Sequence, residues 1–371
     1  MKKSLITIPA ILLCLLLSAW GYKAHKKINL NGASNFPAQM SFLSPNWTNI
    51  VTLHCSDADY RKDTVPDEEP RHYIDIDNYT EFLESNCIPE AYDSVLQIHG
   101  LNWVILQGIL PWATETTFDS LKSCFQRKDW NRSALFAADL GHYVGDGHQP
   151  LHITRNYNGQ YTGQDGIHSR YESKMINKYD AQIVYPADSV QMIGKVRTYI
   201  FSYIYKNYTL LDSILAADTY AHTIAGNVTS DVYYQALWSK CGAFTIDLYR
   251  RASKSLADLI YTAWIQAGSP VIYPNFLSEP EDLFRTRLLQ NFPNPFREIT
   301  TIPVEINQSN THISLKVYDA FGNLKTELVN DKIAKGYYEI RWDAGNFPNG
   351  VYYCILKADD WTATRKMVVV K

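Results

Sequence analysis

The sequence predicts an all-α domain followed by a small all-β sandwich. From about residue 20 to 265, apolar residues recur at three- and four-residue steps, as in "SVLQIHGLNWVILQGIL" (94–110). This is the period of amphipathic helices, so we expect a helical bundle with long loops. After residue 288 the pattern changes to short runs of β-formers separated by Gly, Asn and Pro, as in "GYYEIRWDAGNFPNGVYYCILKA" (336–358). That pattern is typical of an antiparallel sandwich.

The chain begins with the features of a secretory signal peptide. "MKKSLITIPAILLCLLLSAW" (1–20) has a basic start, an apolar run over 5–17 and small residues before a cleavage site after Ala19. The apolar run is short for a transmembrane helix. We therefore expect residues 1–19 to be removed, which makes Trp20 the first residue of the mature protein.

Three segments follow the predicted signal peptide. We expect the helical domain to cover residues 20–268, a linker rich in Pro and acidic residues to cover 269–287, and the sandwich to cover 288–371. The formal net charge of -3 gives no broad reason to bind nucleic acid or an anionic membrane, so an anionic substrate has to be held locally. Five cysteines remain after the signal peptide, with no C-x-x-C pair, so a metal would be held by His, Asp and Glu.

The stretch "GHYVGDGHQPLH" (141–152) gathers side chains that bind metals. His142 and Asp146 are four residues apart and therefore share one face of a helix, and Pro150 ends that helix before His152. We expect Asp139, three residues before His142, to orient its imidazole. A lone histidine in a helix is more often structural than a ligand.

Further segments of the same domain repeat this pairing of histidine with carboxylates. "GIHSRYESK" (166–174) places His168 and Glu172 four residues apart. Upstream, "LHCSDADYRKD" (53–63) contains Asp57 and Asp59, "RHYIDID" (71–77) contains His72 and Asp75, and "WGYKAH" (20–25) ends in His25. So many pairs in one exported helical domain favour a metal site over chance composition.

These segments resemble, in order, those of the superfamily of zinc-dependent phospholipases C and single-strand-specific S-one/P-one nucleases. The shared features are an N-terminal Trp-Gly with a nearby His, an Asp loop, H-x3-D-x5-H and H-x3-E, over about residues 20–175. The resemblance implies an all-helical fold and three zinc ions. It implies that the first ion is held by Asp57, His72, His142 and Asp146. It implies that the second is held by the amine and carbonyl of Trp20 with His25, while Asp146 bridges. It implies that the third is held by His152, His168 and Glu172.

The resemblance predicts a monomeric zinc-dependent hydrolase that cleaves phosphodiester bonds with metal-activated water, and Asp57 and Asp146 are the catalytic candidates. Two residue assignments stay open. "SDAD" offers Asp57 and Asp59, of which we prefer Asp57, and His148 is expected to support the ligands without being one.

The substrate also stays open. Glu172 and the modest gap between His152 and His168 favour a phospholipase C-like enzyme, whereas the close spacing of Trp20 and His25 favours an endonuclease on single-stranded DNA or RNA. A phospholipase would want exposed apolar loops at the mouth of the site, such as residues 36–47. A nuclease would stack bases on aromatic residues, for which the candidates are Tyr73, Trp103, Trp112 and Tyr171. A non-catalytic zinc-binding surface protein is a further alternative. A serine hydrolase is not supported, because the sequence contains no G-x-S-x-G motif.

The β-rich tail resembles the type IX secretion sorting domain. The motifs that carry this resemblance are "LLQNFPNPF" (288–296), "VYDAFGNL" (317–324), "GNFPNGVYY" (345–353) and the basic end "RKMVVVK" (365–371). It implies that the type IX secretion machinery is a partner, and that the protein crosses the periplasm and the outer membrane to become secreted or displayed at the cell surface. A carbohydrate-binding or structural sandwich is the alternative for this tail.

Overall fold

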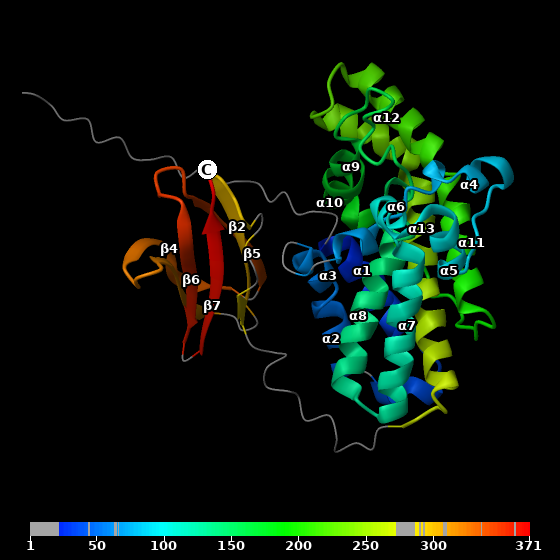
Figure 1. The fold of residues 1–371 in the computed structure, drawn as a ribbon, viewed down its shortest axis with the longest axis horizontal. Coiled ribbons are helices and arrows are strands. Elements are labelled where there is room, and N and C mark those ends of the chain that lie inside the picture. Colours follow the sequence, from blue (N-terminus) through cyan, green and yellow to red (C-terminus); the bar gives the residue numbers. More distant parts are fainter. Residues whose placement is uncertain are drawn as a thin grey trace, which may run out of the picture.

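The structure is a computed structural model that describes residues 22–43, 45–62, 65, 67–271, 286–288, 291, 294–306, 310–334, 336–359 and 361–371. Its helical part and its β part are separate regions of the chain (Figure 1). The prediction of an all-α domain followed by a β-sandwich is therefore confirmed. Trp20, the predicted signal peptide and most of the predicted linker lie outside the described residues.

The helical part mixes long α-helices with short 3₁₀ turns and one π-helical stretch, η5. None of the described helices has both the length and the apolar character needed to cross a membrane. In chain order the elements are α1 (Tyr22–Ser34), η1 (Ala38–Leu43), α2 (Asn46–Leu53), α3 (Asp57–Arg61), η2 (Glu69–His72), η3 (Ile76–Asn78), α4 (Thr80–Ser85), α5 (Tyr92–His99), α6 (Leu101–Gln107), α7 (Leu110–Arg127), α8 (Trp130–Asp146), η4 (Pro150–His152), α9 (Ile167–Ser169), η5 (Arg170–Met175), α10 (Ile176–Tyr179), η6 (Asp180–Gln182), α11 (Val196–Tyr208), α12 (Leu211–Ala225) and α13 (Asp231–Gln266).

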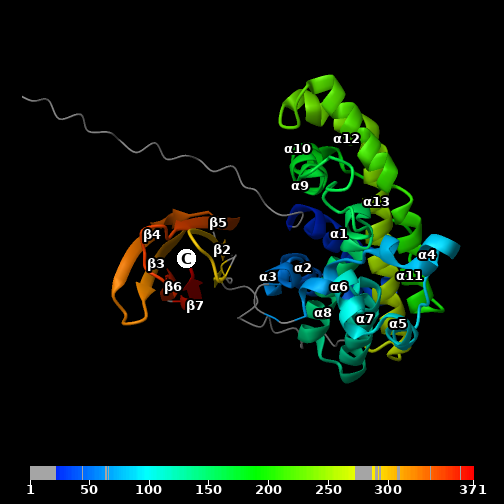
Figure 2. The same cartoon turned by 45° about the horizontal axis from the view of Figure 1, so that its top comes forward.

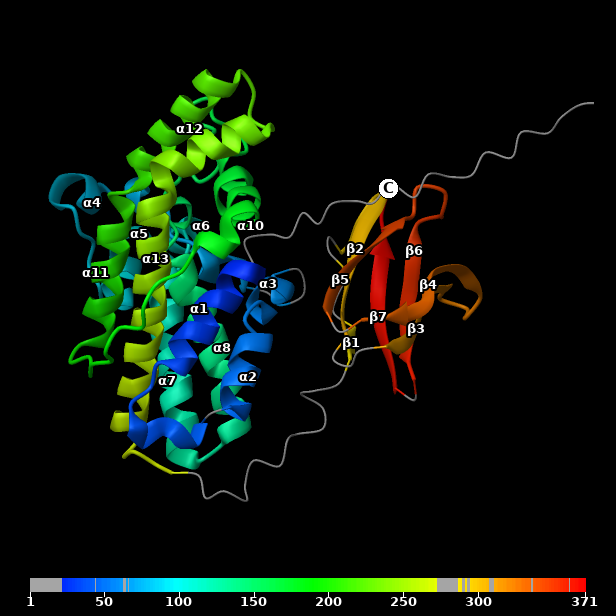
Figure 3. The same ribbon diagram turned by 180° about the vertical axis from the view of Figure 1, so that it is seen from behind.

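The long helix α13 is the central support of the helical part, and α1, α7, α8 and α12 pack against it (Figure 3). Its first turn is capped by Ser230, whose side chain accepts a hydrogen bond from the backbone N–H of Tyr233. Leu256 of α13, Leu140 of α8 and Trp47 of α2 are fully buried in the shared core. The bundle therefore holds α1, α8 and α13 together by apolar packing around a common interior.

Helices α7 and α8 form an antiparallel pair joined by a tight turn. Lys128 ends α7 in the left-handed conformation, and the Asp129 side chain then caps α8 by accepting from the backbone N–H of Arg132 at 3.2 Å. This turn fixes the direction of α8, whose last two turns are buried and carry His142 and Asp146.

The β part consists of two antiparallel sheets (Figure 2), of strand order β1-β2-β5 and β4-β3-β6-β7. Alternate residues of β3, such as Leu315 and Val317, face a core that includes Trp342 and Leu356 from other strands. The strands are β1 (Arg287–Leu288), β2 (Ile299–Ile306), β3 (Thr311–Asp319), β4 (Leu324–Ile333), β5 (Gly336–Asp343), β6 (Gly350–Ala358) and β7 (Trp361–Val369).

Glycines on α8 allow α1 to approach it closely. A Cβ on Gly141 would lie 2.1 Å from Oδ1 of Asn29 in α1 and 2.8 Å from Cδ2 of Leu256. Asn29 is fully buried, and its amide donates to the carbonyls of Val51 at 3.0 Å and Ala138 at 3.1 Å. Asn29 thus links α1 to α2 and α8 by hydrogen bonds. The short distance between α1 and α8 at this point is possible because residue 141 is a glycine.

We predict that Gly141→Ala lowers the free energy of unfolding by about 3 kcal/mol, since the new methyl group displaces Asn29 and leaves its buried amide unpaired. The midpoint of urea unfolding, followed by the helical circular dichroism signal, measures this change. Gly194→Ala is the matched control, because Gly194 is exposed and nothing lies within 4 Å of a Cβ placed there. An equal midpoint for both variants would contradict the packing argument.

Candidate metal centre

Asp146, the last residue of α8, lies at the centre of a cluster of imidazoles. Its side chain is only 2% exposed. Its Oδ2 atom lies 3.0 Å from His72 Nδ1 and 3.4 Å from His142 Nε2, and its Oδ1 atom lies 3.5 Å from His25 Nε2 and 3.6 Å from His152 Nδ1. One buried carboxylate therefore joins residues from α1, η2, α8 and η4, which are far apart in the sequence.

Three groups of side chains, two of which share His142, have ligand atoms close enough to share a metal ion. They span 25 to 172 in the sequence, and within each group the ligand atoms lie within 4.8 Å of one another. The groups are His72, His142 and Asp146; His25, Asp59 and His142; and His152, His168 and Glu172.

Three of these imidazoles are oriented by main-chain carbonyls. The Nδ1 atoms of His142, His152 and His168 lie 2.8, 2.8 and 3.2 Å from the carbonyl oxygens of Cys55, His72 and Tyr157. A carbonyl only accepts, so each Nδ1 donates, and in the neutral imidazole Nε2 then keeps its lone pair for the cluster. A ligating histidine is usually held in this way through its other nitrogen.

The expectation that Asp139 orients His142 is wrong. Asp139 is instead paired with Arg61, whose guanidinium nitrogens lie 3.0 and 3.2 Å from its carboxylate oxygens. The carbonyl of Cys55 takes the orienting role, and a main-chain carbonyl leaves no signal in the sequence.

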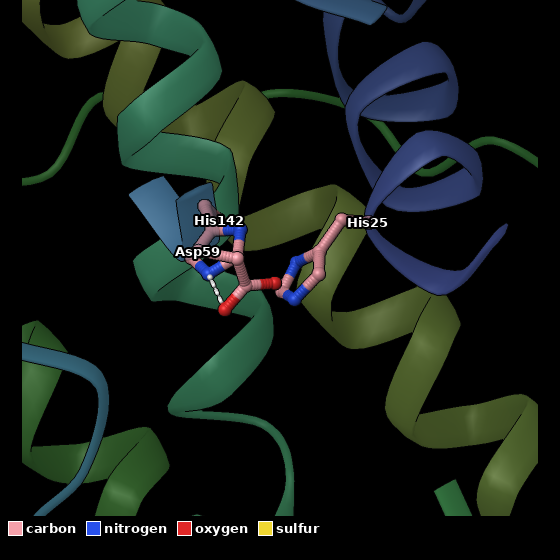
Figure 4. Close-up of side chains that lie close together, drawn as sticks. All are labelled: His25, Asp59 and His142. Atoms are coloured by element: carbon pink, nitrogen blue, oxygen red, sulfur yellow. Dashed lines mark ion pairs between the residues drawn. The ribbon is translucent and has the colours of Figure 1, made fainter. Parts of the chain in front are cut away.

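Figure 4 shows the group formed by His25, Asp59 and His142, which come from α1, α3 and α8. The rings of His25 and His142 are stacked with centroids 3.8 Å apart. Asp59 Oδ1 lies 3.5 Å from His142 Nε2. Helix α1 also approaches α8 closely within the site. A Cβ on Gly145 of α8 would lie 2.8 Å from His25 Nδ1, so the position of His25 requires a glycine there.

The structure places Asp59, and not the preferred Asp57, in this cluster. Residues two apart on a helix project in nearly opposite directions, so only one of the two aspartates of α3 can face the imidazoles. Asp57 Oδ2 lies 2.7 Å from His54 Nδ1, and Arg287 of β1 donates to both oxygens of Asp57 at 3.0 and 3.2 Å. The carboxylate of Asp57 is therefore occupied elsewhere.

The third group lies where the chain leaves α8 and forms α9 and η5. His168 Nε2 lies 2.7 Å from Glu172 Oε1, and His152 Nε2 lies 3.3 Å from Glu172 Oε2. Gln149 donates its amide to the same Oε2 at 3.1 Å. Both oxygens of Glu172 thus face imidazoles, as the four-residue spacing of His168 and Glu172 predicts.

Of the remaining candidates, Trp20 lies outside the described residues, while His25 follows in the first turns of α1. His148 faces the core and not the cluster. Its Nδ1 donates to the Val144 carbonyl at 2.8 Å, and its ring stacks on Tyr203 with centroids 4.4 Å apart. Burial lowers the pKa of His148 to about 3, so it is a neutral packing residue.

The charge balance of the cluster is that of a cation site. Burial raises the pKa of Asp146, Asp59 and Glu172, but the neighbouring cationic groups outweigh it and hold all three below their usual range, that of Glu172 at about 2. Burial lowers the pKa of His152, but Asp146 and Glu172 raise it to about 9. Burial and His142 lower the pKa of His25 to about 4. Two buried ionised carboxylates, Asp146 and Glu172, and the partly exposed Asp59 therefore need positive charge, which protons on some imidazoles or divalent ions can supply.

A cavity of about 380 Å³ opens onto this cluster. It reaches the imidazoles of both η2 and η4 and the third group, so the cluster is accessible to a small molecule. Its lining residues are Lys62, Glu69, His72, Tyr73, Asp75, Leu106, Leu151, His152, Tyr157 and His168.

Two residues near the cluster were not singled out from the sequence. Lys62 Nζ lies 2.7 Å from Asp59 Oδ1, and Glu68 Oε1 lies 3.6 Å from His72 Nε2 and accepts from the Tyr143 hydroxyl. Glu68 sits in the acidic run 67–69, where composition gave no reason to prefer one carboxylate. Lys62 is three residues from Asp59, a spacing that could have indicated the pair.

The tail matches the family described as the secretion system C-terminal sorting domain, over residues 290–370. This segment covers β2 to β7 and overlaps all four motifs that suggested the type IX sorting domain. The tail is therefore a type IX sorting domain, and the protein is secreted or displayed at the cell surface.

Two solved structures are similar to nearly the whole chain. Alpha toxin from Clostridium absonum has 12% sequence identity and a TM-score of 0.40, covering 96% of this chain and 97% of that chain. Alpha-toxin of Clostridium perfringens from avian strain SWCP has 9% identity and a TM-score of 0.43, covering 95% of this chain and 98% of that chain. Likenesses of this size leave the chemistry to be argued from the site.

A curated relative gives a different similarity. A probable serine protease from Bradyrhizobium tropiciagri is 25% identical over 218 residues, which is 50% of this chain and 27% of that protein. The chain thus spans about a quarter of the length of this relative, and the match does not define the activity of the present protein.

We predict that Asp59→Asn weakens zinc binding by about 10-fold or more, because it removes a charged oxygen ligand. Zinc affinity is measured by competition with a chelator of known affinity. Asp57→Asn on the same helix is the matched control and should leave zinc affinity unchanged. If Asp57→Asn weakens zinc binding and Asp59→Asn does not, Asp57 is the ligand, as first preferred.

Proposed function

We propose that the helical domain is a zinc-dependent hydrolase of phosphodiesters, with phospholipase C-like activity, exported by means of its sorting tail. The observation that supports this best is the convergence of three groups of imidazoles and carboxylates around Asp146, at the wall of an open cavity. A metal site that keeps an accessible face is typical of catalysis, whereas a structural site is closed.

The donor set fits zinc. Imidazole nitrogens and carboxylate oxygens are its usual ligands, and the carbonyls that hold His142, His152 and His168 are the usual outer partners. We propose three ions, held by His72, His142, Asp146, His25, Asp59, His152, His168 and Glu172, with the amine of Trp20 as a further ligand once the signal peptide is removed. When bound, zinc supplies Lewis-acid chemistry that acidifies water and neutralises a phosphodiester.

The chain's own carboxylates divide the remaining work. Asp146 faces imidazoles through both oxygens, so its role is to hold the first two groups together. Asp59 is the more accessible of the two, with a side chain 22% exposed against 2% for Asp146. We therefore give Asp59 the catalytic role first assigned to Asp57, namely to orient a water and accept its proton.

The mouth of the cavity favours a lipid substrate. Leu106 of α6 lines the cavity and is 70% exposed, and Leu101 and Ile98 nearby are 57% and 56% exposed. Residues 94–114 contain no Asp, Glu, Lys or Arg. An exposed, uncharged apolar rim suits the boundary between lipid head groups and acyl chains.

The large apolar side chains of residues 36–47, first considered for this role, pack against the helical core. Met40, Leu43 and Trp47 are completely buried in the helical core. The exposed apolar residue that lines the cavity is instead Leu106 of α6.

An endonuclease is the alternative. Tyr73 and Tyr157 line the cavity and could stack on bases, whereas Trp112 and Tyr171 are buried. Glu69 also lines the cavity, and its negative charge disfavours a polyanion. Since the cavity reaches the imidazoles, the non-catalytic zinc-binding protein is less well supported than either enzyme.

The contact between Ser255 of α13 and His148 is not the catalytic triad of a serine protease. Ser255 Oγ lies 3.4 Å from His148 Nε2. However, His148 Nδ1 donates to the Val144 carbonyl and not to a carboxylate, and both side chains are buried. A triad needs an accessible serine and an acidic partner for the histidine.

The proposal is tested with purified protein that begins at Trp20. We expect chelator-sensitive hydrolysis of phosphatidylcholine vesicles that re-added zinc restores, with no cleavage of single-stranded DNA or RNA. Cleavage of nucleic acid without lipid turnover would establish the endonuclease. Inactivity on all of these despite tightly bound zinc would favour the non-catalytic protein.

His142→Ala should lower the activity by about 100-fold or more, because it removes a side chain shared by two ligand groups. The initial rate of diester hydrolysis measures this loss. His222→Ala is the control, since His222 is exposed on α12 and outside every ligand group of the described residues. If the two variants behave alike, the proposed ligands are wrong.

Leu106→Asp should lower the rate on phosphatidylcholine vesicles by about 30-fold, since burying one leucine in lipid is worth about 2 kcal/mol. The rate on a short-chain, monomeric phosphatidylcholine should stay the same. Ile224→Asp on α12 changes a residue of comparable exposure, 55%, away from the cavity and should leave both rates unchanged. An equal fall on both substrates for Leu106→Asp would contradict a role at the lipid surface.

A further inference from the structure

Lys62 brings a positive charge to the edge of the metal centre. It directly follows α3 and lines the cavity together with His72, His152 and His168. Its Nζ atom lies 2.7 Å from Asp59 Oδ1, and the side chain is 31% exposed. The ammonium group is thus held at the boundary between the ligand cluster and the solvent-accessible space.

The other charged side chains of the cavity wall make this position unusual. Among the described residues that line the cavity, Lys62 is the one with a lysine or arginine side chain. Glu69 and Asp75, which also line it, are acidic residues. An anionic group that enters the cavity is therefore repelled by Glu69 and attracted towards Lys62 and the imidazoles beside it. The charges of the cavity wall therefore guide an anionic group towards the metal centre.

The pair with Asp59 leaves Lys62 able to bind a second anion. An ammonium group has three N–H donors, and its contact with Asp59 Oδ1 uses one of them. Lysine is a common phosphate ligand because its point charge sits on a flexible stem. A partly exposed Lys–Asp pair by itself adds little stability, so stability alone gives a weak reason for this lysine.

On this basis we infer that Lys62 binds a non-bridging phosphate oxygen of the substrate and sets the phosphate against the imidazoles of His72 and His152. The inference rests on the proposed phosphodiesterase function and adds to it a binding residue outside the metal ligands. It assigns Lys62 to substrate binding, so its loss should raise KM more than it lowers kcat.

The test measures binding of inorganic phosphate to the zinc-loaded protein by calorimetry. Lys62→Met should weaken phosphate binding by about 10- to 100-fold, the range for a charge-assisted hydrogen bond, while bound zinc stays the same. Lys62→Arg keeps the charge and should bind phosphate within a few-fold of the original chain. The KM for the diester should follow the same order.

Lys122→Met is the matched control. Lys122 forms the same kind of pair, with Asp119 three residues earlier, and its side chain is 28% exposed, but it lies on α7 away from the cavity lining. It should leave phosphate binding unchanged.

Two outcomes would overturn the inference. If Lys62→Met loses zinc, Lys62 acts by positioning Asp59; if it binds phosphate as well as the original chain, Lys62 does not contact phosphate. These failures differ from failure of the proposed function, in which the original zinc-loaded chain itself would neither bind phosphate nor hydrolyse a diester.

Discussion

The burial of Asp146 is the constraint on which the rest of the helical domain depends. A carboxylate with almost no exposure is costly unless positive or hydrogen-bonding groups surround it. Four histidines meet this need, and they come from α1, η2, α8 and η4. The elements that carry them must therefore keep their relative positions, and the close approach of α1 to α8 at Gly141 and Gly145 helps to keep them.

Patterns with a local cause were predictable from the sequence. Apolar periodicity indicated the helices and strands, and the four-residue spacings of His142 with Asp146 and of His168 with Glu172 indicated shared faces. The choice between Asp57 and Asp59 was not predictable, because the rotation of the short helix α3 depends on tertiary packing. Likewise, no side-chain pattern reveals that the carbonyl of Cys55 orients His142.

The two parts of the protein divide export from chemistry. The sandwich buries an ordinary apolar core and matches a sorting domain, whereas the carboxylates and imidazoles of the cluster all belong to the helical part. The parts nevertheless touch, since Arg287 of β1 binds Asp57 and lies beside His54. Asp57 thus belongs to the surface that meets the tail, while Asp59, two residues further, belongs to the cluster.

The imidazoles of the third ligand group are more exposed to water than His142, which the other two groups share. The side chain of His142 is 1% exposed, that of His152 is 11% exposed and that of His168 is 27% exposed. An ion held by His152, His168 and Glu172 would exchange with the medium sooner than an ion deeper beside His142, because fewer atoms must move to let it out. With the proposed ions, the protein would then pass through partly loaded forms in a fixed order, and the outermost ion would set the threshold for full loading.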